Sequence, residues 1–119
     1  MKSFRDLKFW DRTHKLVVRV YEVSRGFPKE ELINLTATIR RCVTSIGSLL
    51  VEGVAVAGER EPTSHVQNAI AATGQLEYLV LLSRDLGYMD EAAYQELTAE
   101  TIELRRSLVS HLVKIRTLR

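Results

Sequence analysis

The sequence predicts an all-α fold, an antiparallel up-and-down four-helix bundle that residues 1–119 form as one domain. Apolar residues recur at alternating spacings of three and four in four blocks, which is the pattern of amphipathic helices. Short turn signals separate the blocks, and helices joined by short turns pack as antiparallel neighbours. No block alternates apolar and polar residues with a period of two over a convincing length, so a β-sheet is not expected.

The first helix is expected over residues 7–24. Gly26 permits a left-handed cap there, and Pro28 cannot continue a helix. At 100° per residue, the apolar positions form two stripes about 120° apart, which is more apolar surface than one core seam needs. One stripe holds Leu7, Trp10, His14, Val17 and Tyr21, and the other holds Phe9, Leu16, Val20 and Val23.

The second helix is expected over residues 29–57, with a break at Gly58. Its core stripe reads Leu32, Leu35, Ile39, Cys42, Ile46, Leu49, Gly53 and Val56.

The third helix is expected from about Glu59 to Leu86, with Gly87 closing it. Glu59 and Glu61 suit the positive end of the helix dipole, and Pro62 is tolerated in a first turn. The core positions are Val66, Ala69, Ile70, Thr73, Leu76 and Val80.

The fourth helix is expected to begin at Asp90, a side chain that can cap a helix N-terminus. Its core stripe reads Tyr94, Leu97, Thr101, Leu104, Leu108, Leu112 and Ile115. A second apolar strip follows Ile102, Val109 and Val113, and the run over residues 79–82 is entirely apolar. Surplus apolar strips on the first and fourth helices predict self-association, because isolated subunits rarely leave large apolar patches exposed.

Several motifs resemble the S23 family, the small bacterial four-helix-bundle proteins associated with 23S rRNA intervening sequences. The most specific are Phe27-Pro28, Ile39-Arg40-Arg41, Ser45-Ile46, Glu52-Gly53 and Leu86-Gly87-Tyr88. The resemblance covers essentially the whole chain. It implies a cytoplasmic four-helix bundle assembled as a ring-like homo-oligomer such as a pentamer. The family has no established reaction, and related bundles that bind nucleic acid make RNA or DNA a partner to test.

Charge is distributed unevenly along the chain, although the net charge is only +2. Residues 1–25 carry seven basic and three acidic groups, and residues 105–119 carry five basic groups and no acidic one. Residues 62–104 hold one arginine and seven acidic groups. Because successive helices reverse direction, the start of the first helix and the end of the fourth share one end of the bundle. Both basic segments are expected to meet there.

A row of five cations on the first helix is the candidate functional site. At helical spacing, its members fall within an arc of about 80°, so they could follow a phosphate backbone. They are Arg5, Lys8, Arg12, Lys15 and Arg19, and the patch could be widened by Arg105, Arg106, Lys114, Arg116 and Arg119. Alternatively, Asp11, Glu22 and the acidic groups of the third and fourth helices pair with these cations within or between subunits.

Glu77 falls within the apolar arc of the third helix, between Thr73 and Leu81. A buried carboxylate requires a partner or becomes protonated. Counting outward from the turn at Gly58 places Arg40 and Arg41 at about the same level on the second helix. The sequence therefore predicts a structural ion pair between Glu77 and one of these arginines.

Catalytic, metal and cofactor sites are not expected. No histidine has a glutamate three residues before it, as di-iron bundles require, although Glu61 and His65 could share a surface ion. His14 is expected in the core or at an interface. Cys42 lies in an apolar run, where a thiol is poorly activated, and no phosphate-binding glycine loop occurs.

The N-terminus holds no uncharged signal segment, and no stretch is long enough to span a membrane, which predicts a cytoplasmic protein. The leading prediction is a non-enzymatic, homo-oligomeric structural or interaction protein without a small-molecule substrate. The alternative is an RNA- or DNA-binding accessory protein that uses the basic row of the first helix.

Overall fold

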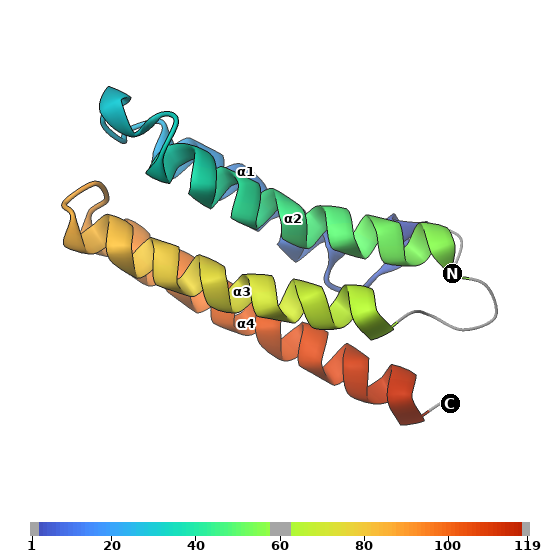
Figure 1. Ribbon diagram of the computed structural model, residues 1–119. Helices are drawn as coiled ribbons and strands as arrows, with labels where there is room; N and C mark the ends of the chain where they lie inside the picture. The colour runs from blue at the N-terminus through green and yellow to red at the C-terminus, as the bar shows by residue number, and fades with distance from the viewer. Residues whose placement is uncertain (1–2, 58–62, 118–119) are drawn as a thin grey trace.

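The computed structural model describes residues 3–57 and 63–117 and confirms the all-α four-helix bundle (Figure 1). The helices are α1 (Trp10–Ser24), α2 (Leu35–Val56), α3 (Thr63–Asp85) and α4 (Glu91–Thr117). Two short 3-10 helices, η1 (Phe4–Asp6) and η2 (Lys29–Glu31), precede α1 and α2. The signals at Gly58, Glu59, Glu61 and Pro62, and the cation Arg119, lie outside the described residues.

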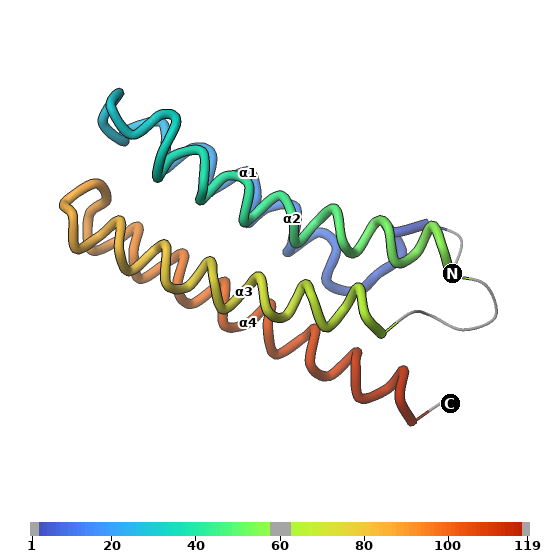
Figure 2. Tube along the Cα trace, viewed as in Figure 1, coloured from blue at the N-terminus to red at the C-terminus, as the bar shows by residue number. Residues whose placement is uncertain are grey.

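The four helices run up and down along an elongated body of 46 × 23 × 19 Å. α1 packs against α2 and α4, and α3 packs against the same two helices, so α1 and α3 are diagonal partners (Figure 2). α1 begins and α4 ends at the same end of the bundle, which we call the terminus end. The opposite end, where α1 passes to α2 and α3 to α4, is the loop end. The two basic segments therefore meet at the terminus end, as the alternation of helix direction predicts.

The core contains most of the predicted periodic positions of the four helices, together with Val43 and Leu50 of α2, which the predicted stripe did not include. Most of the threonine and serine side chains buried within it donate their hydroxyls to carbonyls one turn earlier, whereas the hydroxyl of Thr36 has no hydrogen-bond partner among the described residues. Thr13 donates to Phe9 O over 2.8 Å, and Thr101 donates to Leu97 O over 2.7 Å. The largest fully buried side chains include Val20, Ile39, Val43, Ile46, Leu76, Val80, Leu97, Leu104 and Leu108.

Two helices begin later than the sequence predicts. The first was expected from Leu7, but Ser3 and Asp6 form a capping box around η1, and Leu7 is extended. The second was expected from Lys29, where η2 forms instead, so α2 starts only at Leu35. Leu32 consequently lies outside the helix and is 60% exposed, which contradicts its expected core position.

The two glycine turns end their helices differently. Gly87 has φ 81°, and the amides of Gly87 and Tyr88 donate to Arg84 O and Ser83 O, which forms a Schellman motif. The prediction of a left-handed cap at Gly26 is wrong, because Gly26 does not have positive φ. Tight turns from Gly26 N to Val23 O and from Phe27 N to Ser24 O close α1 instead, before Pro28. Asp90 caps α4 as predicted, accepting from Ala93 N over 2.8 Å.

The surplus apolar strip of α4 lies at the surface of the bundle, whereas the outer stripe of the first helix is mostly covered, because Leu7 is buried and Trp10 and Val17 pack against the core. On α4, Val109 is 42% exposed and Val113 is 54% exposed. On α1, Phe9, Leu16 and Val20 are buried, whereas Tyr21 of the other stripe is exposed. His14 belongs to that outer stripe and is exposed, so its expected core position is wrong, although a surface position leaves an interface role open. Val56, expected in the core, is also exposed at the last turn of α2.

Candidate functional site

The predicted basic row does not form one continuous helix face. Arg5 lies in η1, with its guanidinium 4.5 Å from the centroid of the Phe4 ring, and Lys8 lies in the turn before α1. Only Arg12, Lys15 and Arg19 lie on α1. The late start of α1 therefore separates the row into a helical group of three cations and two cations at the terminus end.

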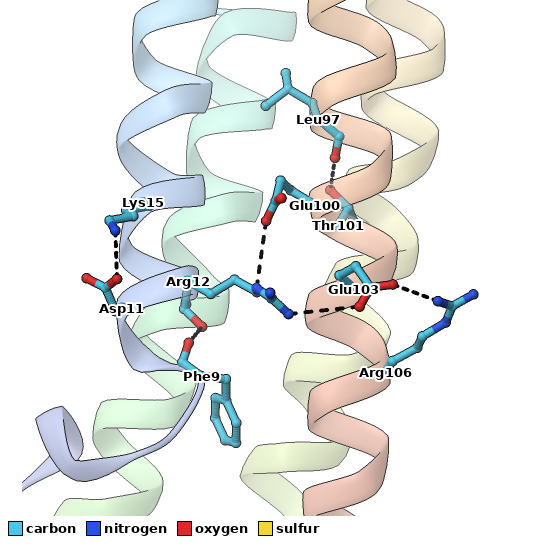
Figure 3. A network of polar contacts seen from close by, with 10 residues as sticks. Phe9, Asp11, Arg12, Lys15, Leu97, Glu100, Thr101, Glu103 and Arg106 are labelled. Atoms are coloured by element: carbon cyan, nitrogen blue, oxygen red, sulfur yellow. Dashed lines mark hydrogen bonds and ion pairs between the residues drawn. The ribbon is translucent and has the colours of Figure 1, made fainter.

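All three helical cations have carboxylate partners within the chain. Arg12 reaches across to α4, 3.8 Å from Glu100 and 4.0 Å from Glu103 (Figure 3). Arg19 donates from Nε to both carboxylate oxygens of Glu96, over 3.0 and 2.9 Å. These contacts confirm the alternative in which acidic groups of the fourth helix pair with the row within one subunit.

Lys15 instead pairs with Asp11, one turn earlier on its own helix, over 2.8 Å. Hydrogen bonding to Asp11 raises the pKa of Lys15, and hydrogen bonding to Glu96 raises the pKa of Arg19. Both cations therefore keep their charge at neutral pH, but each already has a counter-charge beside it. Such partly neutralised groups offer less positive charge to an external anion.

Glu77 has a partner other than the predicted one. Its carboxylate accepts from Nη2 of Arg105 on α4, and Nε of Arg105 donates to Thr73 Oγ1 over 3.0 Å. Arg40 donates to Ser24 Oγ over 2.8 Å and stacks on Tyr21 of α1, and Arg41 is exposed. The prediction of a pair with Arg40 or Arg41 is wrong, because Glu77 lies on the side of α3 that faces α4.

The three histidines lie in separate environments. The ring of His14 stacks on Trp10 at 6.1 Å, and the ring of His111 meets Phe9 edge-on at 5.2 Å. Nε2 of His65 is 3.9 Å from Glu52 Oε2. Across residues 3–57 and 63–117, no group of three or more metal-ligating side chains gathers. The surface ion considered for Glu61 and His65 involves Glu61, which is outside the described residues.

Cys42 is buried, and its thiol donates to Ala72 O over 3.4 Å. Burial raises the pKa of this thiol to about 11. A thiol is nucleophilic as the thiolate, so the environment suppresses the form that would react. The geometry fits a packing residue, as the surrounding apolar run predicts.

A groove of about 1330 Å³ runs between α1 and α4 and contains most of the predicted basic row. Towards the loop end it is lined by the Arg19–Glu96 pair, together with Arg12 and Glu100. Towards the terminus end its lining includes Lys8, Ser107, Ser110, His111 and Lys114. Of the α4 cations expected to widen the patch, Arg106 and Lys114 line the groove, whereas Arg105 turns to Glu77 on α3. The hydroxyls of Ser107 and Ser110 are lining groups that charge patterning does not reveal.

Within the described part of the chain, no helix is both long and apolar enough to cross a membrane. A search of curated proteins finds no match to the chain. The family model described as 23S rRNA-intervening sequence protein matches residues 5–110, which include all of α1, α2 and α3 and most of α4. Together with the four-helix bundle, this match confirms the resemblance drawn from the motifs, and the chain belongs to the 23S rRNA-intervening sequence protein family.

Proposed function

We propose that this chain is a non-enzymatic, cytoplasmic interaction protein that works as a homo-oligomer. The observation that carries the proposal is the exposed apolar surface on helices that lie diagonally across the bundle. Tyr78 on α3 is 59% exposed, and Val18 on α1 is also exposed. Because α1 and α3 do not touch, these side chains face different directions, and each needs a partner outside the chain.

The exposed strip on α4 supports the same proposal. Val109 and Val113 are one helical turn apart on the outer side of α4, away from the core positions Leu108 and Leu112. Two separate apolar faces on one subunit favour a head-to-tail contact, which closes into a ring when the rotation between subunits permits. A ring of five subunits is the form that the family resemblance implies.

Light scattering after size-exclusion chromatography tests this proposal. We expect the wild-type protein to have a mass several times that of the 13.5 kDa chain at micromolar concentration. The double variant Val109→Glu/Val113→Glu should have a lower mass, because it places charge in the apolar contact. The matched control Gln95→Glu/Ala99→Glu adds the same charge at exposed positions of α4 and should leave the mass unchanged.

Two results would contradict the proposal. A wild-type protein with the mass of one chain would rule out the homo-oligomer. A wild-type oligomer that is unaffected by Val109→Glu/Val113→Glu would rule out this strip as the contact.

RNA or DNA binding is the second candidate function. The ion pairs of Arg12, Lys15 and Arg19 weaken the case for the row on α1, because binding by that row would compete with carboxylates of the same chain. The cations at the terminus end of the bundle favour nucleic-acid binding at a different place.

A further inference from the structure

The terminus-end half of the α1–α4 groove is charged differently from the loop-end half. In the loop-end half, Arg19 and Arg12 are balanced by Glu96 and Glu100. In the terminus-end half, Lys8 and Lys114 are exposed, and neither forms an ion pair with another described residue. Along the groove, the lining thus changes from cations that form ion pairs to cations that do not.

Other groups in this half also suit an anionic ligand. Arg106 lies at the exposed rim and pairs with Glu103 of its own helix over 2.6 Å, on the side opposite Arg12 (Figure 3), so Lys8 and Lys114 are the cations of this half without an ion pair among the described residues. Ser107 and Ser110 line the groove and bring hydroxyl donors. The acidic groups of the lining nearest this half are Asp6, which accepts a hydrogen bond from Ser3 N over 3.2 Å, and Asp11, which pairs with Lys15 over 2.8 Å. Cations therefore outnumber carboxylates here.

The spacing of the cations favours an extended ligand. Arg106 and Lys114 are eight residues apart on α4, which corresponds to about 12 Å along the helix. An extended ligand can contact both without either side chain bending along the helix towards the other. One strand of a DNA duplex carries a phosphate about every 3.4 Å along the axis, so about three or four phosphates span this distance.

The groove contacts the backbone of such a strand more readily than its bases. Phe9 lies within the groove lining but is buried, with its ring against His111. Among the described lining residues, the exposed aromatic ring is that of His14, and it already stacks on Trp10 at 6.1 Å. Recognition by cations and hydroxyls alone is largely independent of sequence.

We propose that the terminus-end half of the α1–α4 groove binds the sugar–phosphate backbone of a nucleic acid strand through Lys8, Arg106 and Lys114. This site differs from the row on α1, because Lys8 lies on the α1 side of the groove and Arg106 and Lys114 lie on the α4 side. The inference goes beyond the proposed homo-oligomer and does not require it, since a single chain carries the whole groove.

Fluorescence anisotropy with a labelled 20-nucleotide RNA, single-stranded and as a duplex, tests the site. We expect wild-type affinity to fall as salt rises. Lys8→Glu/Lys114→Glu should bind at least tenfold more weakly at 50 mM salt, and the slope of log affinity against log salt should decrease by about two. The control Arg25→Glu/Lys29→Glu changes net charge equally at the loop end, where both side chains are exposed. It should bind as the wild type does.

The competitor and the control distinguish this site from the alternatives. Unlabelled oligonucleotide should displace the probe, and millimolar AMP or poly-glutamate should not. Equal loss in the two double variants would mean non-specific attraction and overturn the site. Displacement by AMP would show that the ligand need not be extended and would overturn the proposal. Displacement by poly-glutamate would indicate an acidic protein partner in place of nucleic acid. Absence of RNA binding would overturn the proposal outright. Light scattering on the same samples reports assembly separately, so failure here is distinguishable from failure of the homo-oligomer.

Discussion

At the scale of single residues, the face of the helix on which a charged residue lies determines its ion-pair partner. Glu77 and Arg40 lie at similar levels of the bundle when counted from the α2–α3 turn, yet they do not pair. A residue of α3 can face α2 or α4, and a shift of one position turns a side chain by 100°. The sequence shows that Glu77 is a carboxylate within an apolar arc. Its partner, however, is determined by how α4 packs against α3.

A double-mutant cycle tests this pair. Glu77→Ala and Arg105→Ala should show a coupling of about 1 kcal/mol in the free energy of unfolding, measured by urea denaturation. The value is modest because both side chains are partly exposed. The cycle of Glu77→Ala with Arg40→Ala should show coupling near zero. Coupling in the second cycle and none in the first would restore the pair predicted from sequence.

Cys42 should make stability depend on pH in the alkaline range. Its folded pKa of about 11 exceeds the ordinary value of 9.0. The folded state therefore resists losing the thiol proton, and the associated stability is complete below pH 9 and is lost as pH rises towards 11. Wild-type protein should lose stability relative to Cys42→Ser over that interval in urea titrations. Parallel pH profiles of the two proteins would show instead that the thiol titrates normally.

At the scale of elements, apolar periodicity predicts that four α-helices form. The residues at which they begin and end depend on local hydrogen bonds and turn geometry. The four helices and the Asp90 cap agree with the sequence prediction. The starts of α1 and α2 do not, since the apolar periodicity extends over the turn at residues 7–9 and over η2, neither of which is α-helical. Apolar spacing reports which residues could share a face, whereas hydrogen bonds such as those of Ser3 and Asp6 decide where the helix begins.

The two glycine turns give a matched test of this local chemistry. Gly87→Ala should destabilise the protein by about 1 to 2 kcal/mol, because its φ of 81° strains any residue with a Cβ atom. Gly26→Ala should change stability by less than about 0.5 kcal/mol, since Gly26 does not need positive φ and its added Cβ would lie 3.6 Å from Val23 O. Thermal and urea unfolding of both variants measure the difference. Equal effects would mean that the two turns use glycine in the same way.

At the scale of the whole molecule, the seam between α1 and α4 differs from the others. The α1–α4 groove occupies this seam, and ion pairs of Arg12 and Arg19 cross it. These pairs are partly exposed, so salt screens them, whereas apolar contacts in the rest of the core do not weaken with salt. Ion pairs also join α3 to α4, where Arg105 meets Glu77 and Arg84 meets Glu91, but the groove leaves α1 and α4 less closely packed than α3 and α4. The attachment of α1 therefore depends most on its ion pairs.

Hydrogen exchange should reveal this difference. Amides of α1 should exchange faster in 500 mM than in 20 mM sodium chloride, because screened ion pairs allow local opening. Amides in the middle of α2 and α3 should keep their protection, and they provide the internal control. Uniform changes in all four helices would show that the bundle opens only as one unit.

The sequence by itself determined the four helices, most of the apolar core, the surplus strip on the fourth helix, and the meeting of both basic segments at one end. These properties depend on spacing along the chain, which helix geometry converts directly into faces. Only the tertiary structure decided that Glu77 pairs with Arg105, that Arg12 and Arg19 are neutralised by α4, and that Lys8 and Lys114 share a groove. Such contacts join distant parts of the chain, and they depend on the rotation of each helix about its axis, which apolar periodicity constrains too loosely to choose between neighbouring partners.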